Sequence, residues 1–270
     1  MGGAVYAASL ETDSSGTGAG TIAINGGLVQ TTGTQTYREA ITLGANTTLA
    51  GSTINNVSTI NGSNKSLTIT GAADVDGTIT GVTNLSVSGT SNLGANVTTS
   101  GTQTYTGAVT LSGGNRTLTT TDSQITFSDI VNSAATETRG LTLNVGTSEV
   151  EFNGIVGGAT DGGLGAIAIT GNLDLNNTIT GAASLSVSGT SNLGANVTTS
   201  GTQTYTGAVT LSGGNRTLTG TTINTVSTVD GGGNGFTITG EADIDGEITR
   251  VTNLSVFGAS NLGANVTTTG

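Results

Sequence analysis

The sequence predicts an all-β fold, a parallel β-solenoid in which each coil of chain takes about 18 residues. Three observations support this prediction: long internal repeats, a finer period of apolar residues within them, and an unusual composition. Val, Ile and Leu recur at short intervals between Thr, Ser, Gly and Asn, while Pro, Cys, His and Trp are absent from the 270 residues. This composition indicates many short strands separated by turns.

Long repeats cover most of the chain. Residues 85–119 and 185–219 are identical, and residues 52–101 match residues 221–270 at most positions. Self-similarity at this scale is typical of solenoids, in which each repeat stacks on its neighbours.

The motif Thr-Gln-Thr-Tyr begins each large repeat unit. It occurs at Thr34, Thr102 and Thr202. We therefore expect a single solenoid over residues 21–270, preceded by an N-terminal lead-in or cap segment at 1–20. Its predicted repeat units are 34–101, 102–201 and 202–270.

A shorter period lies inside the units. Leu49, Leu67 and Leu85 are spaced at equal intervals of about 18 residues, too short for a helix pair but suitable for two or three strands with tight turns. We expect about four coils in a 68-residue unit and some 13 to 15 coils in all.

Alternation within each coil separates an apolar interior from a polar exterior. In Leu67-Thr68-Ile69-Thr70 the apolar side chains point one way and the hydroxyls the other. Gly and Asn, as in residues 94–96 and 113–115, suit corners where φ is positive. No 3.6-residue period is sustained, so we expect almost no helix.

Charge and composition argue against several functions. The net charge of −11 disfavours binding to nucleic acid or anionic lipid, both of which require basic patches. No run approaches the roughly 18 apolar residues needed to cross a membrane. Without Cys and His, disulfides and zinc sites of the usual kind are excluded, and we expect no cofactor.

Several phrases resemble those of one family. NVTTSGTQTYTGAVTLSG at 96–113 and 196–213, and TQTYREAITLGANTTL at 34–49, look like the repeats of filamentous-haemagglutinin-like bacterial exoproteins. The resemblance covers roughly residues 21–270. It implies a right-handed parallel β-helix, a secreted or cell-surface location on bacteria, and a role as an adhesin or structural filament, with a cell-surface or glycan partner.

The repeat phase at the C-terminus suggests self-association. Gly270 corresponds to Gly101 and Gly201, each of which is followed directly by TQTY. An open last coil presents an unpaired strand edge. We therefore expect end-to-end contact with a second copy, which would build a filament.

Five acidic residues form the only weak candidates for a cation site. Asp74 and Asp76 lie in DVDG, and Asp243, Asp245 and Glu247 lie in DIDGE. Carboxylate oxygens suit Ca²⁺, but calcium loops need further ligands at fixed spacing. Stacked Asp and Asn side chains on an outer face are the favoured interpretation, and we assign no metal ligand.

No catalytic site is predicted, although some enzymes acting on polysaccharides share this fold. His is absent, and the few basic residues are scattered through the repeats, at Arg38, Lys65, Arg116, Arg139, Arg216 and Arg250. We therefore expect no enzymatic activity.

A ligand-binding solenoid is the main alternative, with ice or a glycan as the ligand. Thr-x-Thr pairs such as Thr68 and Thr70 could order water on a flat face. At a constant 18-residue period, however, residues 50 and 52 precede this pair and break the ladder. Glycan platforms require exposed aromatic residues, whereas Tyr37, Tyr105 and Tyr205 are predicted to be interior.

Overall fold

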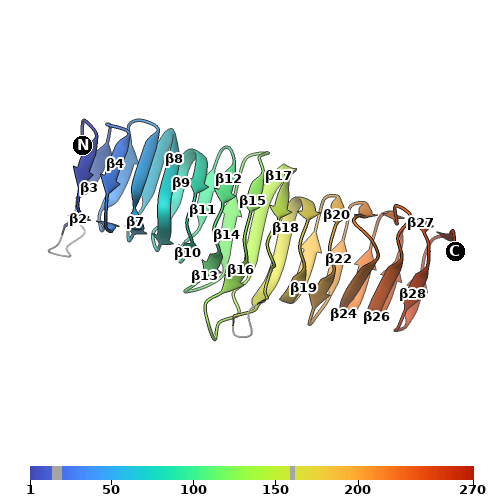
Figure 1. Cartoon of the computed structure of the whole chain (residues 1–270). Helices are drawn as coiled ribbons and strands as arrows, with labels where there is room; N and C mark the ends of the chain where they lie inside the picture. Colours follow the sequence, from blue (N-terminus) through green and yellow to red (C-terminus); the bar gives the residue numbers. More distant parts are fainter. Residues whose placement is uncertain (14–19, 159–161) are drawn as a thin grey trace. The chain divides into compact units, whose positions relative to one another are not determined.

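A computed structural model describes residues 1–13, 20–158 and 162–270, and residues 14–19 of the predicted lead-in segment lie outside this description. The chain divides into two compact units, Met1–Asp129 and Ile130–Gly270. Within the described ranges there is no helix, and parallel strands form a β-solenoid of about 13 turns spaced about 19 residues apart. The β-solenoid prediction is confirmed. Figure 1 shows the strands of successive coils side by side within each unit.

Most strands are short because a corner follows every few residues. The first unit contains β1 (Val5–Ala7), β2 (Leu10–Thr12), β3 (Thr21–Ile24), β4 (Leu28–Thr31), β5 (Gln35–Tyr37), β6 (Ala40–Leu43), β7 (Thr47–Asn56), β8 (Ile60–Val75), β9 (Ile79–Val87), β10 (Ser91–Leu93), β11 (Val97–Thr99), β12 (Gln103–Tyr105), β13 (Val109–Leu111), β14 (Arg116–Thr119) and β15 (Ile125–Phe127). The second contains β16 (Val131–Ser133), β17 (Leu141–Phe152), β18 (Leu164–Leu175), β19 (Ile179–Val187), β20 (Ser191–Leu193), β21 (Val197–Thr199), β22 (Gln203–Tyr205), β23 (Val209–Leu211), β24 (Arg216–Thr225), β25 (Val229–Asp230), β26 (Phe236–Ile244), β27 (Ile248–Val251), β28 (Leu254–Val256), β29 (Ser260–Leu262) and β30 (Val266–Thr268).

Each coil has three strand segments. In the first unit β10 pairs in parallel with β13, and the intervening β11 and β12 pair with β14 and β15. The long strands β7, β8 and β9 bend at corners and contribute to more than one ladder. The cross-section, which the sequence left open between two and three strands, therefore has three faces.

We name the faces of the first unit by their strand segments. Face 1 contains β1, β4, residues 47–50, 67–70 and 85–87, β12 and β15. Face 2 contains β2, β5, residues 53–56 and 73–75, β10 and β13. Face 3 contains β3, β6, residues 60–61 and 79–82, β11 and β14.

The second unit has the same construction. One of its ladders aligns Leu141, Ile167, Leu185, Gln203, Ile223, Ala242 and Ser260 in successive coils. The identical segments 85–119 and 185–219 also have identical registers, since Val97 pairs with Leu118 and Val197 with Leu218.

Coil length varies more than the sequence predicted. The 18-residue spacing holds between Leu67 and Leu85, but Leu49 lies level with Ile69 rather than Leu67. A longer step, of 26 residues, joins Leu141 to Ile167. Extra residues are placed at the corners, so the ladders continue in spite of them.

The first 68-residue unit spans slightly less than the four coils that the sequence predicted. Gln35 pairs with Ile54 in the next coil, and the same column continues through Ala73 to Ser91, which completes three coils. Gln103 lies two strands after the strand of Ser91. The unit thus spans three coils and two strands. As a result, the Gln-Thr-Tyr segment lies on face 2 in β5 and on face 1 in β12.

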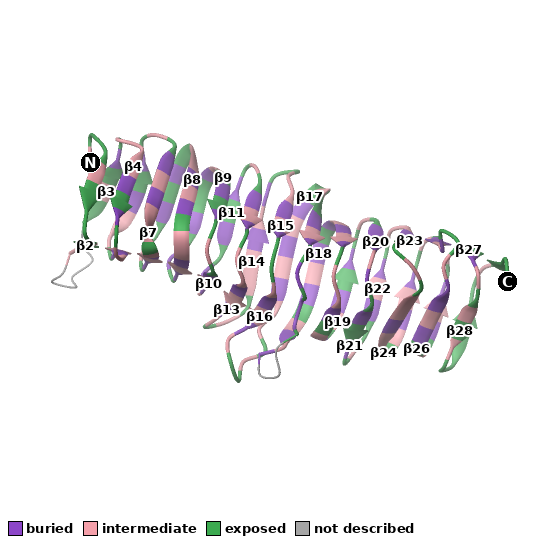
Figure 2. Cartoon of the chain, in the orientation of Figure 1, coloured by how far each residue is buried: buried purple, intermediate pink, exposed green. Residues whose placement is uncertain are grey.

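Burial alternates along the strands, as the sequence predicted. On face 1 one inward column consists of side chains that are at most 1% exposed, namely Val29, Leu49, Ile69, Val87, Tyr105 and Phe127. The rings of Tyr105 and Phe127 stack at 5.3 Å between centroids. Figure 2 shows this alternation as purple bands between pink and green ones.

Glycines stack at the corner between faces 1 and 2. A Cβ atom on Gly71 would lie 1.9 Å from the carbonyl oxygen of Gly51, and one on Gly89 would lie 2.4 Å from the carbonyl carbon of Gly71. The next residue of the column is Gly107, whose Cβ would lie 2.6 Å from Gly89. Successive coils can approach at this corner only because none of these residues carries a side chain.

We expect Gly89→Ala to destabilise the solenoid by roughly 1–3 kcal/mol, because its Cβ would overlap rigid backbone. Urea denaturation followed by circular dichroism measures this loss. Gly114→Ala is the control, since its Cβ would meet only the end of the flexible Arg116 side chain, at 3.0 Å. Equal stability of the two variants would contradict the proposed close stacking.

Candidate functional site

The most elaborate polar arrangement in the molecule is buried and belongs to the Thr-Gln-Thr-Tyr motif. Tyr37, Tyr105 and Tyr205 are completely buried, which confirms their predicted interior position. Each hydroxyl donates a hydrogen bond to the Oε1 atom of the Gln two residues before it, at 2.8, 3.0 and 3.0 Å respectively. Burial raises the pKa of all three hydroxyls, so they remain protonated donors.

The glutamine side chain connects two coils. Gln103 Nε2 donates to the Thr119 carbonyl oxygen in the next coil at 2.9 Å and contacts Thr99 Oγ1 at 3.3 Å. Gln203 makes the matching bonds to Thr219 and Thr199. Gln35 repeats the pattern in the first copy, with Ala50 O at 2.7 Å. The amide therefore satisfies carbonyls at a corner, inside the protein.

Sequence reasoning missed these glutamines. The available signal was a Thr four residues before each Gln, at Thr31, Thr99 and Thr199. Each of these Thr hydroxyls donates to a glycine carbonyl two residues later, at 2.7, 2.6 and 2.8 Å. The glutamine of the motif therefore links two neighbouring coils inside the protein and does not face a ligand. We call these contacts of Gln35, Gln103 and Gln203 the glutamine staple.

The acidic candidates lie in outward ladders of Asp and Asn. Asp74 is half-buried on face 2 between Asn55 and Asn92, and Asn92 Nδ2 donates to Asp74 Oδ1 at 2.7 Å. Asp243 accepts the equivalent bond from Asn261 at 2.9 Å, and Asp174 accepts from Asn192 at 2.8 Å. These bonds favour the structural interpretation of the acidic repeats.

The other three acidic candidates, Asp76, Asp245 and Glu247, are exposed at corners beyond these strands. Over residues 1–13, 20–158 and 162–270, no group of three or more acidic side chains lies close enough together to hold a metal ion.

Asp76 is in an unfavourable electrostatic position. Partial desolvation raises its pKa, the Asp74 carboxylate raises it further, and the Arg116 guanidinium partly offsets both effects. In the second unit the same position is Asn176, whose Nδ2 donates to Asp174 Oδ2 at 3.2 Å. The neutral amide thus replaces a repulsion by a hydrogen bond.

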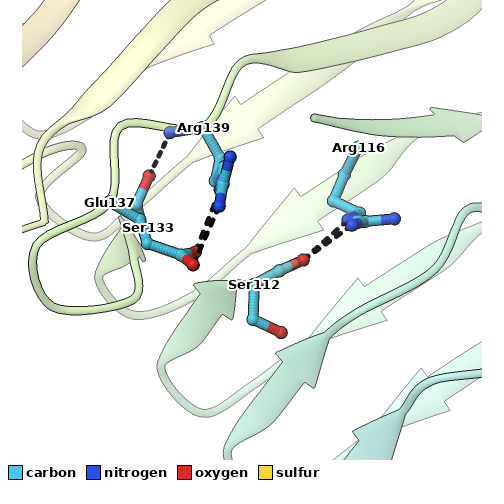
Figure 3. A network of polar contacts seen from close by, with 5 residues as sticks. All are labelled: Ser112, Arg116, Ser133, Glu137 and Arg139. Atoms are coloured by element: carbon cyan, nitrogen blue, oxygen red, sulfur yellow. Dashed lines mark hydrogen bonds and ion pairs between the residues drawn. The ribbon is translucent and has the colours of Figure 1, made fainter. Parts of the chain in front are cut away.

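Basic side chains hold corners and turns. Arg116 donates through Nε and Nη2 to the Ser112 carbonyl at 3.1 and 2.7 Å, and Arg216 donates to Ser212 O at 2.8 Å. Figure 3 shows Arg116 with Ser112 and, separately, the paired hydrogen bonds between Arg139 and Glu137.

Two further arginines form exposed ion pairs. Arg38 pairs with Glu11 at 2.9 Å. Arg250 pairs with Asp230, and this hydrogen-bonded guanidinium lowers the pKa of the Asp230 carboxyl. These contacts support a structural role for the basic residues named here.

Two surface hollows of the second unit differ in their lining. One open hollow of about 450 Å³ is lined by Gly163, Leu164, Gly181, Ala182, Thr198 and their neighbours, and its described lining has no titratable and no aromatic side chain. A second, of about 390 Å³, contains the carboxylates of Glu241 and Asp243. No helix in the described part of the chain is long and apolar enough to cross a membrane.

The stacked parallel strands and internal repeats define a β-solenoid repeat protein. Comparison with known proteins found no matching family model, no matching curated protein and no matching solved structure. The resemblance to filamentous-haemagglutinin-like adhesins therefore rests on the repeat phrases alone.

We expect Gln103→Leu to lower the free energy of unfolding by about 1–3 kcal/mol, because it leaves buried carbonyls and the Tyr105 hydroxyl without partners. Tyr105→Phe keeps the stacking on Phe127 and removes one bond, so its loss should be smaller, about 1 kcal/mol. Urea denaturation of both variants gives the comparison, with the neighbouring outward Thr104→Ala as control. Wild-type stability of Gln103→Leu would show that the staple is dispensable.

We expect Asp76→Asn to raise the melting temperature at neutral pH. The raised pKa means that ionised Asp76 is disfavoured in the folded state, so its charge costs stability above that pKa. Below the ordinary Asp range both states are protonated, and the charge contribution should disappear. Melting curves of wild type and variant between pH 3 and about pH 8 test this. A variant less stable than wild type at neutral pH would refute the electrostatic argument.

Proposed function

We propose that this chain is an extracellular structural β-solenoid of bacterial origin, which acts as the shaft of a surface adhesin or as a subunit of a filament. In this proposal the protein has no catalytic activity. The secreted or cell-surface location follows from the resemblance of the repeats, and the mechanical role follows from the architecture.

The observation that carries the proposal is the continuity of the ladders within each unit. Each inner strand of the ladder through Leu141 and Ser260 pairs with the coil before it and the coil after it. Apolar columns fill the interior, and the buried glutamines connect neighbouring coils at corners. Such an arrangement resists bending because every coil shares backbone hydrogen bonds and core with its neighbours.

One inward side chain near residue 262 is exposed where its counterparts are buried. Leu262 is 49% exposed, whereas its counterparts Leu93 and Leu193 are at most 1% exposed. Leu93 and Leu193 are each covered by the next coil, in which Leu111 and Leu211 lie level with them. A further coil, whether it belongs to the same polypeptide or to a second copy, would bury Leu262 in the same way.

A glycan-binding module and a carbohydrate-active enzyme are the rival classes. Five arginines are engaged in backbone bonds or ion pairs. The described lining of the 450 Å³ hollow lacks a general acid or base, and in the second hollow Asp243 is hydrogen-bonded to Asn261. Both facts favour the structural proposal. Release of sugar from a polysaccharide substrate would favour the enzyme instead.

Negative-stain electron microscopy over a concentration series tests the filament form of the proposal. We expect filaments whose length grows with protein concentration. Leu262→Lys should suppress them, because a charge replaces the apolar surface that a second copy would cover, and Thr98→Lys on face 3 is the control. Discrete particles at every concentration would exclude the filament role and leave that of a shaft.

A further inference from the structure

From residue 48 onward the outer side of face 1 carries two parallel columns of small, uncharged side chains, whereas the two coils before it carry Tyr6, Leu28 and Gln30 at these positions. In the first column Thr68 pairs with Thr48 and Ser86, and Thr104 pairs with Ser86 and Thr126. The second column lies two residues further along each strand and consists of Ala50, Thr70, Ser88, Thr106 and Ser128. Nine of these ten residues carry a hydroxyl group. We call this surface the hydroxyl face.

The register of the hydroxyl face is uninterrupted over five coils. Face 3 is less regular, because its pairing shifts between Val97 and Thr99. The outer column of face 2 includes Asn55, Asp74 and Asn92, so it carries amides and a charge. Face 1 is therefore the face of the first unit on which small hydroxyl side chains repeat evenly in both directions.

The two columns are open to solvent, since all ten of their residues are exposed or half-exposed. Within the part of the chain that the structure describes, the neighbouring hydroxyls of Thr68, Ser86 and Thr104 make no hydrogen bond to protein. Ser88 Oγ accepts a hydrogen bond from the Gly71 N–H at 3.3 Å. The face also carries no charged side chain, although the chain as a whole has a net charge of −11.

The spacing of this array follows from strand geometry. Neighbouring coils lie about 4.8 Å apart, and alternate residues along a strand lie about 6.6 Å apart. Threonine is held stiffly at χ1 on such a surface, so its methyl and hydroxyl groups keep fixed positions. A rigid array of uncharged side chains can hold water molecules at regular positions, because no charged group orients the water around itself.

We propose that the hydroxyl face of residues 48–128 binds ice. An ordered water layer held between the two columns joins the regular oxygen lattice of an ice crystal. The absence of charge on this face matches the absence of charge on the ice surface. The inference is independent of the shaft or filament role.

The structure changes the register that the sequence predicted for this ladder. With a constant 18-residue period, Thr68 and Thr70 were expected to follow residues 50 and 52. The actual partners are Thr48 and Ala50, because this coil takes 20 residues between Thr48 and Thr68. Ala50 is therefore the one position of the two columns without a hydroxyl, and Ser86 and Ser88 follow the Thr pair as the sequence predicted.

The columns are not a by-product of the long repeat. Since the repeat unit spans three coils and two strands, one copy does not return to the face of the copy before it. The five segments on this face differ in sequence, at residues 48–50, 68–70, 86–88, 104–106 and 126–128. Hydroxyl residues nevertheless occupy nearly every outward position.

Thermal hysteresis and ice-crystal shaping, measured on the intact chain by nanolitre osmometry, test the proposal. We expect the wild type to lower the freezing point below the melting point and to produce faceted crystals. Ser86→Lys, in the middle of the hydroxyl face, should lose this activity because a long charged side chain disrupts the array. Thr98→Lys is the matched control, an exposed outward position on face 3.

Circular dichroism and melting curves of both variants establish that the fold is retained. Loss in Ser86→Lys with retention in Thr98→Lys supports the proposal. No hysteresis in the wild type, or equal loss in two folded variants, overturns it. Binding to an insoluble polysaccharide that Ser86→Lys abolishes, without any hysteresis, would overturn the assignment of ice as the ligand.

Discussion

The parallel backbone ladder between successive coils is the constraint on which the structure depends. Each inner strand uses its N–H and C=O groups with the coils on both sides, so it cannot shift without breaking two ladders. Length can change only where the ladder is interrupted, at the corners. The step from Leu141 to Ile167 is eight residues longer than that from Leu67 to Leu85, yet both pairs lie level.

The buried glutamine staple bridges a corner but does not depend on the length of that corner. After Gln103 the matching corner of the next coil has one residue more, whereas after Gln203 it has one residue fewer. The two amides nevertheless bond to equivalent carbonyls, those of Thr119 and Thr219. A side-chain amide can therefore satisfy a buried corner carbonyl where corner length varies.

The alternation of apolar and polar residues correctly predicted the strands and their inward columns. The number of residues in each coil, and with it the register, was not predicted correctly. Strand class, inward columns and buried tyrosines follow from side-chain pattern, which the ladder preserves. Register does not, because corner residues add length without changing the pattern, so Leu49 lies level with Ile69 and not Leu67. The role of Gln103 was hidden because its partner at Thr119 is set by tertiary stacking.

The long repeat does not contain a whole number of coils, so inward and outward positions are constrained differently. Inward positions receive the same environment on all three faces, so a repeat can move from face to face without loss of packing. Outward side chains do not keep the same neighbours when a repeat begins on another face, since each face combines segments from different parts of the repeat. The Asp74–Asn92 ladder on face 2 and the hydroxyl face on face 1 are built by the same coils of the repeated sequence. The outward chemistry therefore differs from face to face, while the core packs in the same way whichever face a repeat begins on.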